Sequence, residues 1–593
     1  MCGIAGTVTF DGSRVSDRFT ETACEVMKHR GPDEVGYFNA PDAALGMCRL
    51  SIIGLHGGSQ PLFSRDRSVV CVVNGEIYNH MQLRAELERS GYDVDGTSDV
   101  AVIPALYQRY GDSFVTHLHG MFAIALLDIN LQRVILATDR TGKKPLLHAT
   151  SASGQLVFAS EMQALLTHPG IGRSTCPTAI DAYLSYRVVP APATIYQDVK
   201  KVPPATLISL ESSGTRTWQY WDFPFTAELQ DEPEEELVAT IDALLHQAVQ
   251  DRLESEVPLG AMLSGGLDSS LVVALAAKKS SEPLHTFSVG FDHPDFDESV
   301  FAKEVSDYCS TIHHNVQLNA SHAAASIDRI LRHMGEPYAF PSAIASDAMY
   351  ALARKTVEVV LTGDGSDEVF CGYRRYKSLL SLPHGNLADD YEGILVDGLS
   401  QANKALLYSD SIKNALGNFP ENHLSHRFEL TDRKSPRLDR AMHVDARFWL
   451  PDAQLVKIDR MSMANSIEPR SPFLDHRLID YVARIPAARK MVDLNEKALL
   501  KSMAVNYLPS SIVNRRKQEL AVPLEGWLTT SLRPAIQSTL LSEESLSRDY
   551  FDADALRIFV TDFRPENAYA LWTLFMLERW HLLQTGTPDP ISV

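Results

Sequence analysis

The spacing of strand-forming and helix-forming runs changes about a third of the way along the chain. Up to about residue 205, short apolar runs alternate with polar and Gly-rich turns, and helical patterns occur only around residues 18–28 and 80–90. This spacing predicts a layered sheet domain. Further on, strand and helix runs alternate from residue 236 to an apolar strand at 357–361. The alternation predicts an α/β domain with a parallel, doubly wound sheet, followed by a mainly helical final third.

A chain of 593 residues is too long for one compact core, so more than one domain is expected. Between Glu211 and Glu235 the composition shifts through an aromatic patch to an acidic run. We interpret this stretch as a boundary between domains over residues 2–210 and 235–593. The acidic run itself is typical of the first turn of a solvated helix, where carboxylates favour the positive end of the helix dipole.

Composition and charge exclude several classes of protein. The formal net charge of −20 argues against a general nucleic-acid binder, because phosphate backbones require clustered Lys and Arg. No run of about 18 or more apolar residues occurs, and the first residues lack the basic and apolar regions of a signal peptide. The seven cysteines are widely spread without a C-x-x-C pair, which argues against disulfides or structural zinc. We therefore expect a cytoplasmic protein with no membrane or nucleic-acid partner.

Cys2 follows only the initiator methionine. Removal of that methionine would leave a cysteine with a free α-amino group. An amine with a pKa of about 7.7–8.0 can serve as the base that activates the thiol as a nucleophile. A cysteine at the second position also occurs by chance, so the interpretation depends on the motifs that follow.

Several motifs follow Cys2 at intervals through the first 200 residues. They cover residues 29–33 (His-Arg-Gly-Pro-Asp), 49–52, 60–62, 74–79 (Asn-Gly-Glu-Ile-Tyr-Asn), 120–123, 139–146 and 158–161. Together with Cys2 they resemble the class II glutamine amidotransferase domain, an N-terminal-nucleophile (Ntn) hydrolase that releases ammonia from glutamine. The resemblance implies an αββα sandwich for this part of the chain.

The same resemblance implies a nucleophile and its oxyanion hole. Cys2 is expected to attack the side-chain amide of glutamine. Asn74 and the backbone N–H of Gly75 are expected to donate hydrogen bonds to the tetrahedral intermediate. His29 and Arg30 are expected to organise the pocket without taking part in the chemistry.

Glutamine itself is expected to be held by charged side chains. Arg49 would bind its α-carboxylate, a task that suits a planar bidentate donor. Glu76 and Asp99 would bind its ammonium group. In the family, the segment that begins at the position of Asp99 usually reads Asp-Thr-Glu-Val. Here residues 99–102 are Asp-Val-Ala-Val, so one supporting carboxylate is missing.

Residues 264–270 (Ser-Gly-Gly-Leu-Asp-Ser-Ser) lie between an apolar strand and a helix-forming run. Small residues let backbone N–H groups approach phosphate oxygens at a helix N-terminus. A plain Gly-rich turn would explain the glycines, but not three serines with an aspartate at the helix entrance. The segment resembles the pyrophosphate loop of N-type ATP pyrophosphatases and lacks the Gly-Lys-Ser/Thr of a Walker A loop, which implies AMP and pyrophosphate as products. The expected ATP-binding residues are Leu263, Ser264, Gly265, Gly266, Asp268, Ser269, Ser270, Val289 and Gly365.

A second loop, residues 362–368 (Thr-Gly-Asp-Gly-Ser-Asp-Glu), follows the apolar strand at 357–361. Carboxylates beside a phosphate site are hard oxygen ligands suited to Mg²⁺, whereas an exposed turn is the simpler alternative. By the family resemblance, Asp268 and Asp367 would coordinate Mg²⁺, and Asp364 would act as a base for ammonia. Lys497 would neutralise pyrophosphate charge in the transition state, unless it is an ordinary surface lysine.

Residues 459–475 (Asp-Arg-Met-Ser-Met-Ala through Glu-Pro-Arg-Ser-Pro-Phe-Leu-Asp) resemble the synthetase domain of glutamine-hydrolysing asparagine synthetases. The implied reaction activates the aspartate side chain as an acyl-adenylate, which ammonia then attacks; its small-molecule substrates are glutamine, ATP and aspartate. The resemblance also implies a homodimer. The sequence departs from the common family pattern at Gly335, at Cys371 and at residues 518–520. An acceptor carboxylate other than that of aspartate is therefore an alternative. Two further hypotheses are a non-catalytic scaffold and a glutaminase with a vestigial synthetase half.

Overall fold

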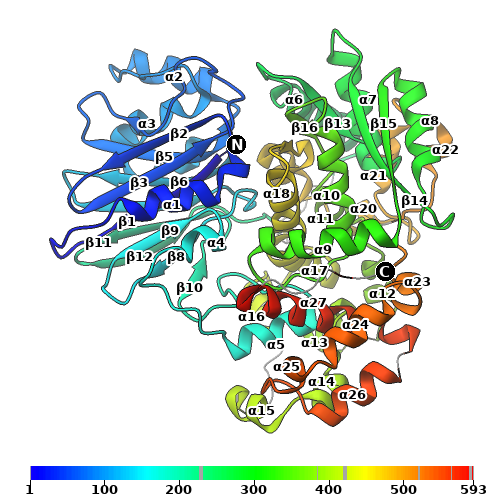
Figure 1. Cartoon of the computed structure of the whole chain (residues 1–593). Coiled ribbons are helices and arrows are strands. Elements are labelled where there is room, and N and C mark those ends of the chain that lie inside the picture. Colours follow the sequence, from blue (N-terminus) through cyan, green and yellow to red (C-terminus); the bar gives the residue numbers. More distant parts are fainter. Residues whose placement is uncertain are drawn as a thin grey trace.

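The computed structural model describes residues 2–225, 232–383, 385–417, 424–518, 521–562, 564–586 and 591. Residues 226–231 of the expected domain boundary, and Glu519 and Leu520 of the departure at 518–520, lie outside these ranges. The N-terminal strands form a layered sheet structure beside a larger α/β part, and helices of the C-terminal third gather at the bottom of the view (Figure 1).

The N-terminal part contains two six-stranded antiparallel sheets. The first has the strand order β10-β8-β9-β1-β3-β2, and the second has the order β12-β11-β7-β6-β5-β4. The strands are β1 (Cys2–Val8), β2 (Glu34–Asn39), β3 (Ala43–Arg49), β4 (Leu62–Phe63), β5 (Val69–Ile77), β6 (Gly120–Asp128), β7 (Arg133–Thr138), β8 (Leu147–Thr150), β9 (Leu156–Ala159), β10 (Val199–Lys201), β11 (Thr206–Glu211) and β12 (Gly214–Gln219).

The two sheets pack face to face and are covered by helices on their outer faces. Side chains such as Ile4, Val72 and Phe158 fill the space between the sheets. Helices α1 (Arg18–Val26) and α4 (Met162–Leu165) contact the first sheet. Helices α2 (His80–Arg89) and α3 (Ile103–Tyr110) share a second buried cluster with strands β5 and β6, beside the short helices η2 (Asp99–Val102) and η3 (Gly111–His117). This layering confirms the expected αββα sandwich.

The second part is built on a five-stranded parallel sheet with the order β15-β14-β13-β16-β17. The strands are β13 (Leu259–Met262), β14 (His285–Phe291), β15 (Ile312–Leu318), β16 (Val359–Leu361) and β17 (Glu468–Arg470), and the connecting helices are α6 (Glu234–Asp251), α7 (Leu267–Lys279), α8 (Ser299–Cys309), α9 (Ala320–Met334) and α10 (Ser342–Ala353). The expected parallel sheet is confirmed. Strands β15 and β17 lack a strong strand pattern, because the first is largely polar and the second has only three residues.

The C-terminal third is mainly helical, as expected, and helix α5 (Pro177–Tyr186) packs against its helices α15 and α27. Among the described residues, no helix combines the length and apolar character needed to cross a membrane. The helices are α11 (Ser366–Phe370), α12 (Arg374–Ser381), α13 (Leu387–Leu395), α14 (Gln401–Leu407), α15 (Asp410–Leu416), α16 (Ser425–Glu429), α17 (Arg437–Val444), η4 (Asp445–Leu455), α18 (Val456–Met463), α19 (His476–Val482), α20 (Ala487–Lys490), α21 (Ala498–Ala504), α22 (Ser510–Val513), α23 (Leu524–Thr529), α24 (Arg533–Leu540), α25 (Glu543–Leu546), α26 (Ala553–Thr561) and α27 (Ala568–Thr585).

A buried ionic network joins the two parts. The guanidinium of Arg30, which is fully buried, donates to both carboxylate oxygens of Asp459 on α18, at 2.8 and 3.0 Å. It also donates to Glu161 at 3.0 Å, and Arg460 lies 3.4 Å from the same carboxylate. Buried charges are tolerated only when they are paired and hydrogen-bonded, so this network fixes how the two parts meet.

Candidate active site

The first candidate centre lies at the start of β1. Cys2 is the Cα partner of Arg49 across the β1–β3 pair, and only 5% of its surface is exposed. Its backbone N–H donates to Asn74 Oδ1 at 2.9 Å, and its carbonyl accepts from Arg30 Nε at 3.1 Å. Burial raises the pKa of the Cys2 thiol, and the positive charge at the start of the chain lowers it in part. The thiol therefore needs a nearby base to become reactive.

Asn74 is arranged as an oxyanion-hole donor requires. Its Oδ1 is occupied by the Cys2 N–H, which leaves the Nδ2 group buried without a hydrogen-bond partner among the described residues. Buried donors are nearly always satisfied, so a lone donor beside a thiol suggests a ligand that the protein binds there. Gly75 follows on β5, where a Cβ would lie 2.3 Å from the carbonyl oxygen of Met121. Only glycine fits at this position.

Arg49 is held beside Cys2 by backbone carbonyls. Its Nη2 donates to Ile53 O at 3.1 Å and to Gly54 O at 2.8 Å, and its Nη1 lies 3.3 Å from the carboxylate of Glu34. A Cβ on Gly58 would lie 2.2 Å from Nη2, so that glycine leaves room for the guanidinium. These contacts fix the orientation of Arg49 before any substrate binds.

The two carboxylates expected to bind the glutamine ammonium group, those of Glu76 and Asp99, lie near the C-terminal end of β5. Asp99 Oδ2 accepts from the backbone N–H of Ile77 at 2.7 Å. Glu76 is 3.0 Å from Nη2 of Arg470, a residue of β17 in the second part of the chain. The carboxylate of Glu76 is thus tied to the other domain, a long-range contact that the local motif does not reveal.

The second candidate centre begins at the loop between β13 and α7. Ser269 Oγ accepts from the backbone N–H of Ser264 at 3.2 Å and lies 3.0 Å from its hydroxyl, which closes the loop. Gly265 has a φ of 74°, and a Cβ there would lie 2.6 Å from the backbone nitrogen of Ala302. Ser270 Oγ is buried with no hydrogen-bond partner in the described part of the chain.

The loop between β16 and α11 meets the first loop through Lys497. The ammonium of Lys497 lies 2.6 Å from Asp268 and 2.6 Å from Asp367. Burial acts to raise the pKa of Asp367, but the charges of Lys497 and Lys517 together hold that pKa below its usual range. Two carboxylates that converge on one cation are chemically suited to a divalent ion such as Mg²⁺.

Two further carboxylates of this loop are buried. Burial raises the pKa of Asp364, which fits a group that accepts a proton. Burial, with the charge of Asp367, raises the pKa of Glu368 to about 7. The hydroxyl of Tyr373 donates to Glu368 at 2.6 Å. Sequence reasoning missed Glu368, Tyr373 and Lys517, although Glu368 lies within the acidic motif it identified.

One cavity of about 530 Å³ is lined by both loops. Of the expected ATP-binding residues, Leu263, Ser264, Gly266, Asp268, Ser269 and Gly365 line it, together with Asp364, Asp367 and Lys497. Gly265 and Ser270 are not among the residues that line it, and Val289 lines a small neighbouring pocket with Ser264.

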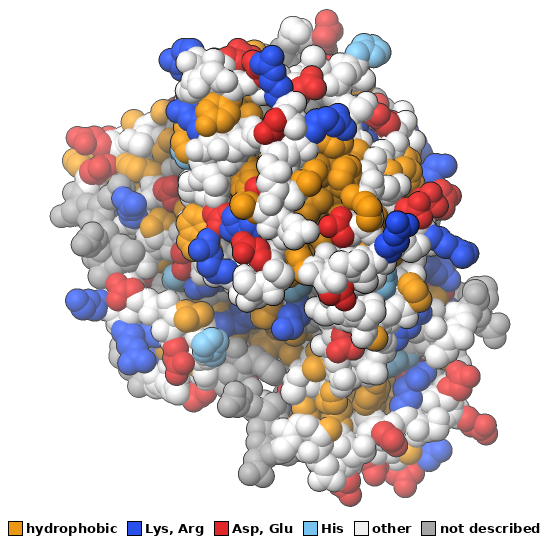
Figure 2. Space-filling view, turned by 90° about the vertical axis from the view of Figure 1, so that its left-hand side faces the viewer, with side chains coloured by type: hydrophobic (Ala, Val, Ile, Leu, Met, Phe, Trp, Pro, Cys, Tyr) orange, Lys and Arg blue, Asp and Glu red, His pale blue; other side chains and the backbone are white. Residues whose placement is uncertain are grey.

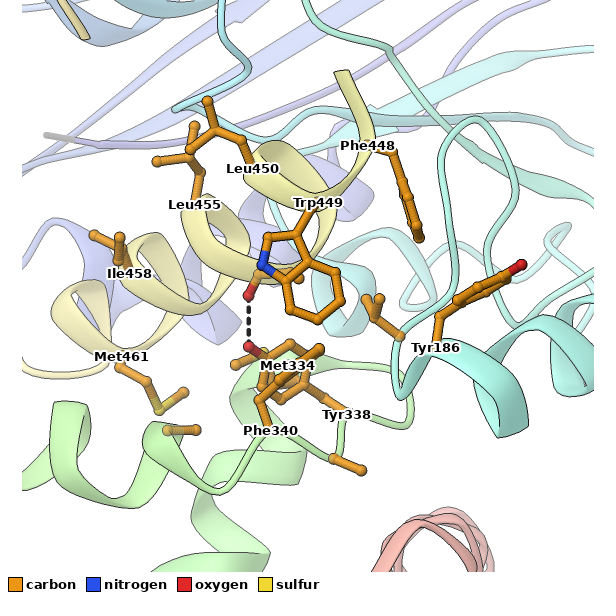
Figure 3. Packing of buried hydrophobic residues seen from close by; sticks show 14 of the residues in the cluster. Tyr186, Met334, Tyr338, Phe340, Phe448, Trp449, Leu450, Leu455, Ile458 and Met461 are labelled. Atoms are coloured by element: carbon orange, nitrogen blue, oxygen red, sulfur yellow. Dashed lines mark hydrogen bonds between the residues drawn. The ribbon is translucent and has the colours of Figure 1, made fainter. Parts of the chain in front are cut away.

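Away from the loops, the cavity continues between aromatic side chains. Trp449 and Phe340 meet edge to face with ring centroids 5.1 Å apart, and Figure 3 shows Phe340 beside Tyr338, whose hydroxyl donates to the Ala453 carbonyl at 2.6 Å. The guanidinium of Arg375 lies between the rings of Tyr373 and Trp449, at 3.7 and 4.5 Å from their centroids. This aromatic part offers room for a second substrate beside the nucleotide.

Charged side chains of both signs lie on one face of the molecule. On the face of the molecule in Figure 2, Lys and Arg side chains are interspersed with Asp and Glu, without one extended basic patch. The interspersed charges agree with the acidic net charge of the chain.

Fold and site together define a class of protein: an Ntn-type amidotransferase domain joined to an ATP-pyrophosphatase-type synthetase domain. Residues 1–221 match the model of the glutamine amidotransferase domain, and residues 240–582 match that of asparagine synthase. The chain belongs to the asparagine synthase family, which confirms the resemblance inferred from its motifs.

The similarity to curated relatives extends over nearly the whole chain. The chain is 30% identical to asparagine synthetase [glutamine-hydrolyzing] 1 of Bacillus subtilis, over 98% of this chain and 96% of that protein. It is 30% identical to asparagine synthetase [glutamine-hydrolyzing] 3 of the same organism, over 92% and 93%. It is also 29% identical to the amidase chyE of Penicillium rubens, over 94% of each.

Proposed function

We propose that the chain is a glutamine-hydrolysing asparagine synthetase. It releases ammonia from glutamine at Cys2 and transfers it to the side-chain carboxylate of aspartate, which ATP activates as an acyl-adenylate with release of pyrophosphate. The observation that carries the proposal is the convergence of Asp268 and Asp367 on Lys497 in the cavity that both loops line. This arrangement suits a bound triphosphate cleaved between its α- and β-phosphates.

In the glutaminase reaction, the α-amino group that removal of the initiator methionine would free takes the proton of the Cys2 thiol, which attacks the amide carbon of glutamine. The C–N bond breaks to release ammonia, and water then hydrolyses the thioester to glutamate. Asn74 Nδ2 and the Gly75 N–H donate to the oxyanion that develops in the transition state, where fixed donors contribute most. Arg49 binds the α-carboxylate, and Glu76 and Asp99 bind the ammonium group.

In the synthetase reaction, the loop over residues 264–270 binds the phosphates of ATP. Asp268 and Asp367 would hold Mg²⁺, which supplies positive charge to the pyrophosphate oxygens. Lys497 stabilises the departing pyrophosphate, and Asp364 accepts a proton from the attacking ammonia. The relatives named asparagine synthetase favour aspartate over another carboxylate as the acceptor.

Ammonia needs a protected route between the two centres, because it would be protonated in bulk water. A cavity of about 60 Å³ lies at the domain interface, lined by residues of both domains that include Leu146, Met162, Met334 and Val456. Its lining combines these apolar side chains with charged ones such as Lys144, Glu336 and Asp452. A cytoplasmic homodimer completes the proposal.

The test is an incubation with glutamine, Mg-ATP and a panel of carboxylates, followed by mass analysis of the amides and nucleotides. Asparagine, AMP and pyrophosphate should form in equal amounts when aspartate is present. ADP as the spent nucleotide, or an amide formed only from another carboxylate, would contradict the proposal. Glutamine hydrolysis without release of AMP and pyrophosphate on addition of any carboxylate would point instead to a vestigial synthetase half.

A further inference from the structure

Arg187 lines the aromatic part of the synthetase cavity although it lies within the residues that match the amidotransferase model. It follows α5 directly, at a φ of 65°. A left-handed backbone is uncommon for a residue other than glycine, and such residues cluster at functional sites. The backbone of Arg187 is fixed on both sides, since its N–H donates to Tyr183 O at 2.6 Å and its carbonyl accepts from Ala339 at 3.0 Å.

The guanidinium of Arg187 is held from two sides by aromatic rings. It lies 4.2 Å from the ring centroid of Phe340 and 4.9 Å from that of Tyr569. Its Nη2 is 2.7 Å from the carboxylate of Asp397, which also lines the cavity. Its Nε is buried and has no hydrogen-bond partner among the described residues. A rigid, partly unsatisfied arginine beside a carboxylate presents one positive and one negative group to the same cavity.

The reacting carboxylate of the acceptor is expected beside Asp364, which lines the same cavity. Lys457 donates to Ser342 Oγ at 3.1 Å and to Gln454 Oε1 at 2.9 Å, and its charge acts on the buried Asp364. Asp364, Phe340 and Arg187 line one cavity, so an acceptor that offers its reacting carboxylate beside Asp364 can have its remaining groups beside Phe340 and Arg187. An amino-acid acceptor carries its α-carboxylate and α-ammonium at that distal end.

We propose that Arg187 and Asp397 form the site that recognises an amino-acid acceptor. Arg187 binds the α-carboxylate of the acceptor, and Asp397 binds its α-ammonium group. This inference rests on the proposed function, since it assumes an amino-acid acceptor. It also means that a side chain contributed by the amidotransferase part of the sequence completes the acceptor site of the synthetase. Arginine suits this role because its planar donors match a carboxylate.

The test measures pyrophosphate release with ammonia as the nitrogen source, so that glutamine hydrolysis does not enter. Three acceptors are compared: aspartate, succinate, which lacks the α-ammonium, and β-alanine, which lacks the α-carboxylate. Arg187→Gln should raise the KM for aspartate on the order of 10- to 100-fold, with a smaller change in kcat, because a charge-assisted contact is lost. Its discrimination against β-alanine should fall by a similar factor.

Asp397→Asn should lose discrimination against succinate instead, and Arg187→Lys should restore part of the affinity for aspartate. The exposed pair Arg557 and Asp554, at 3.1 Å, provides the matched controls Arg557→Gln and Asp554→Asn, which should leave all three acceptors unaffected. Thermal unfolding checks that each variant is folded. If Arg187→Gln does not fold, Asp397→Asn decides alone.

The possible failures are distinguishable. Wild-type protein that activates no aspartate would overturn the proposed function, and this inference with it. Wild-type protein that activates aspartate, while folded Arg187 and Asp397 variants keep its KM and its preference over succinate and β-alanine, would overturn the inference alone.

Discussion

The two centres of this molecule are built in different ways. The proposed glutaminase centre is built on regular strands: Cys2 starts β1, Arg49 ends β3, and Asn74 and Gly75 lie on β5. The synthetase centre sits on loops and helix ends around a cavity of about 530 Å³. Regular strands therefore position the residues of the first centre, whereas loops and helix ends surround the cavity of the second. The two centres should therefore respond independently to most substitutions within them.

The strongest test of that independence is Cys2→Ala. Glutamine-dependent asparagine formation should fall by about 10³-fold or more, because no other group can replace the nucleophile. Ammonia-dependent formation should persist, since the synthetase cavity is untouched. Paired assays of asparagine with each nitrogen source measure both. The half-buried Cys176 supplies the control Cys176→Ala, and equal loss of both activities in Cys2→Ala would show that the centres are not separable.

The converse substitution is Asp367→Asn. It removes one of the two carboxylates that converge on Lys497, so asparagine formation should fall about 10²-fold or more with either nitrogen source. Glutamine hydrolysis, followed as glutamate release, should continue. Exposed Asp554, changed to Asn, is the matched control. If Asp367→Asn forms asparagine at the wild-type rate, the Asp367 carboxylate is not part of the proposed metal site.

Arg30 is the point at which the two centres should cease to be independent. Arg30→Met removes the bidentate partner of the buried Asp459 carboxylate and one of the cationic partners of Glu161, which should cost about 3–5 kcal/mol in unfolding free energy. Chemical denaturation measures this loss. Because Arg30 also binds the Cys2 carbonyl, the ratio of glutamate to asparagine produced should rise above one. An unchanged ratio in a folded variant would mean that the interface does not couple the centres.

The sequence predicted strands and loops formed by neighbouring residues, but it did not predict contacts between distant segments of the chain. The strand and helix alternation predicted β13, β14 and β16 because each is an apolar run next to a clear helix pattern. The loops around Asp268 and Asp364 were found for the same reason, since neighbouring residues supply their chemistry. Contacts between distant segments leave no such pattern. The pairs Arg30–Asp459 and Glu76–Arg470, and the approach of Arg187 to the synthetase cavity, depend on how the domains pack.

The smallest expected effect is a pH dependence confined to the synthetase centre. The folded protein holds the proton of Glu368 up to a pKa of about 7, whereas an unfolded glutamate releases it near its ordinary value of about 4.3. Between these values the folded state binds more protons, so the contribution of Glu368 to stability falls as pH rises, by about 3–4 kcal/mol in all.

Glu368→Gln should remove this contribution, because a neutral amide does not titrate. The difference in unfolding free energy between wild type and variant, measured by denaturation from pH 5 to pH 8, should shift in favour of the variant as pH rises. The exposed Glu429, changed to Gln, is the control and should show no such shift. A difference that stays constant across the range would mean that Glu368 is already ionised in the folded protein at pH 5, with Tyr373 donating to a permanent carboxylate.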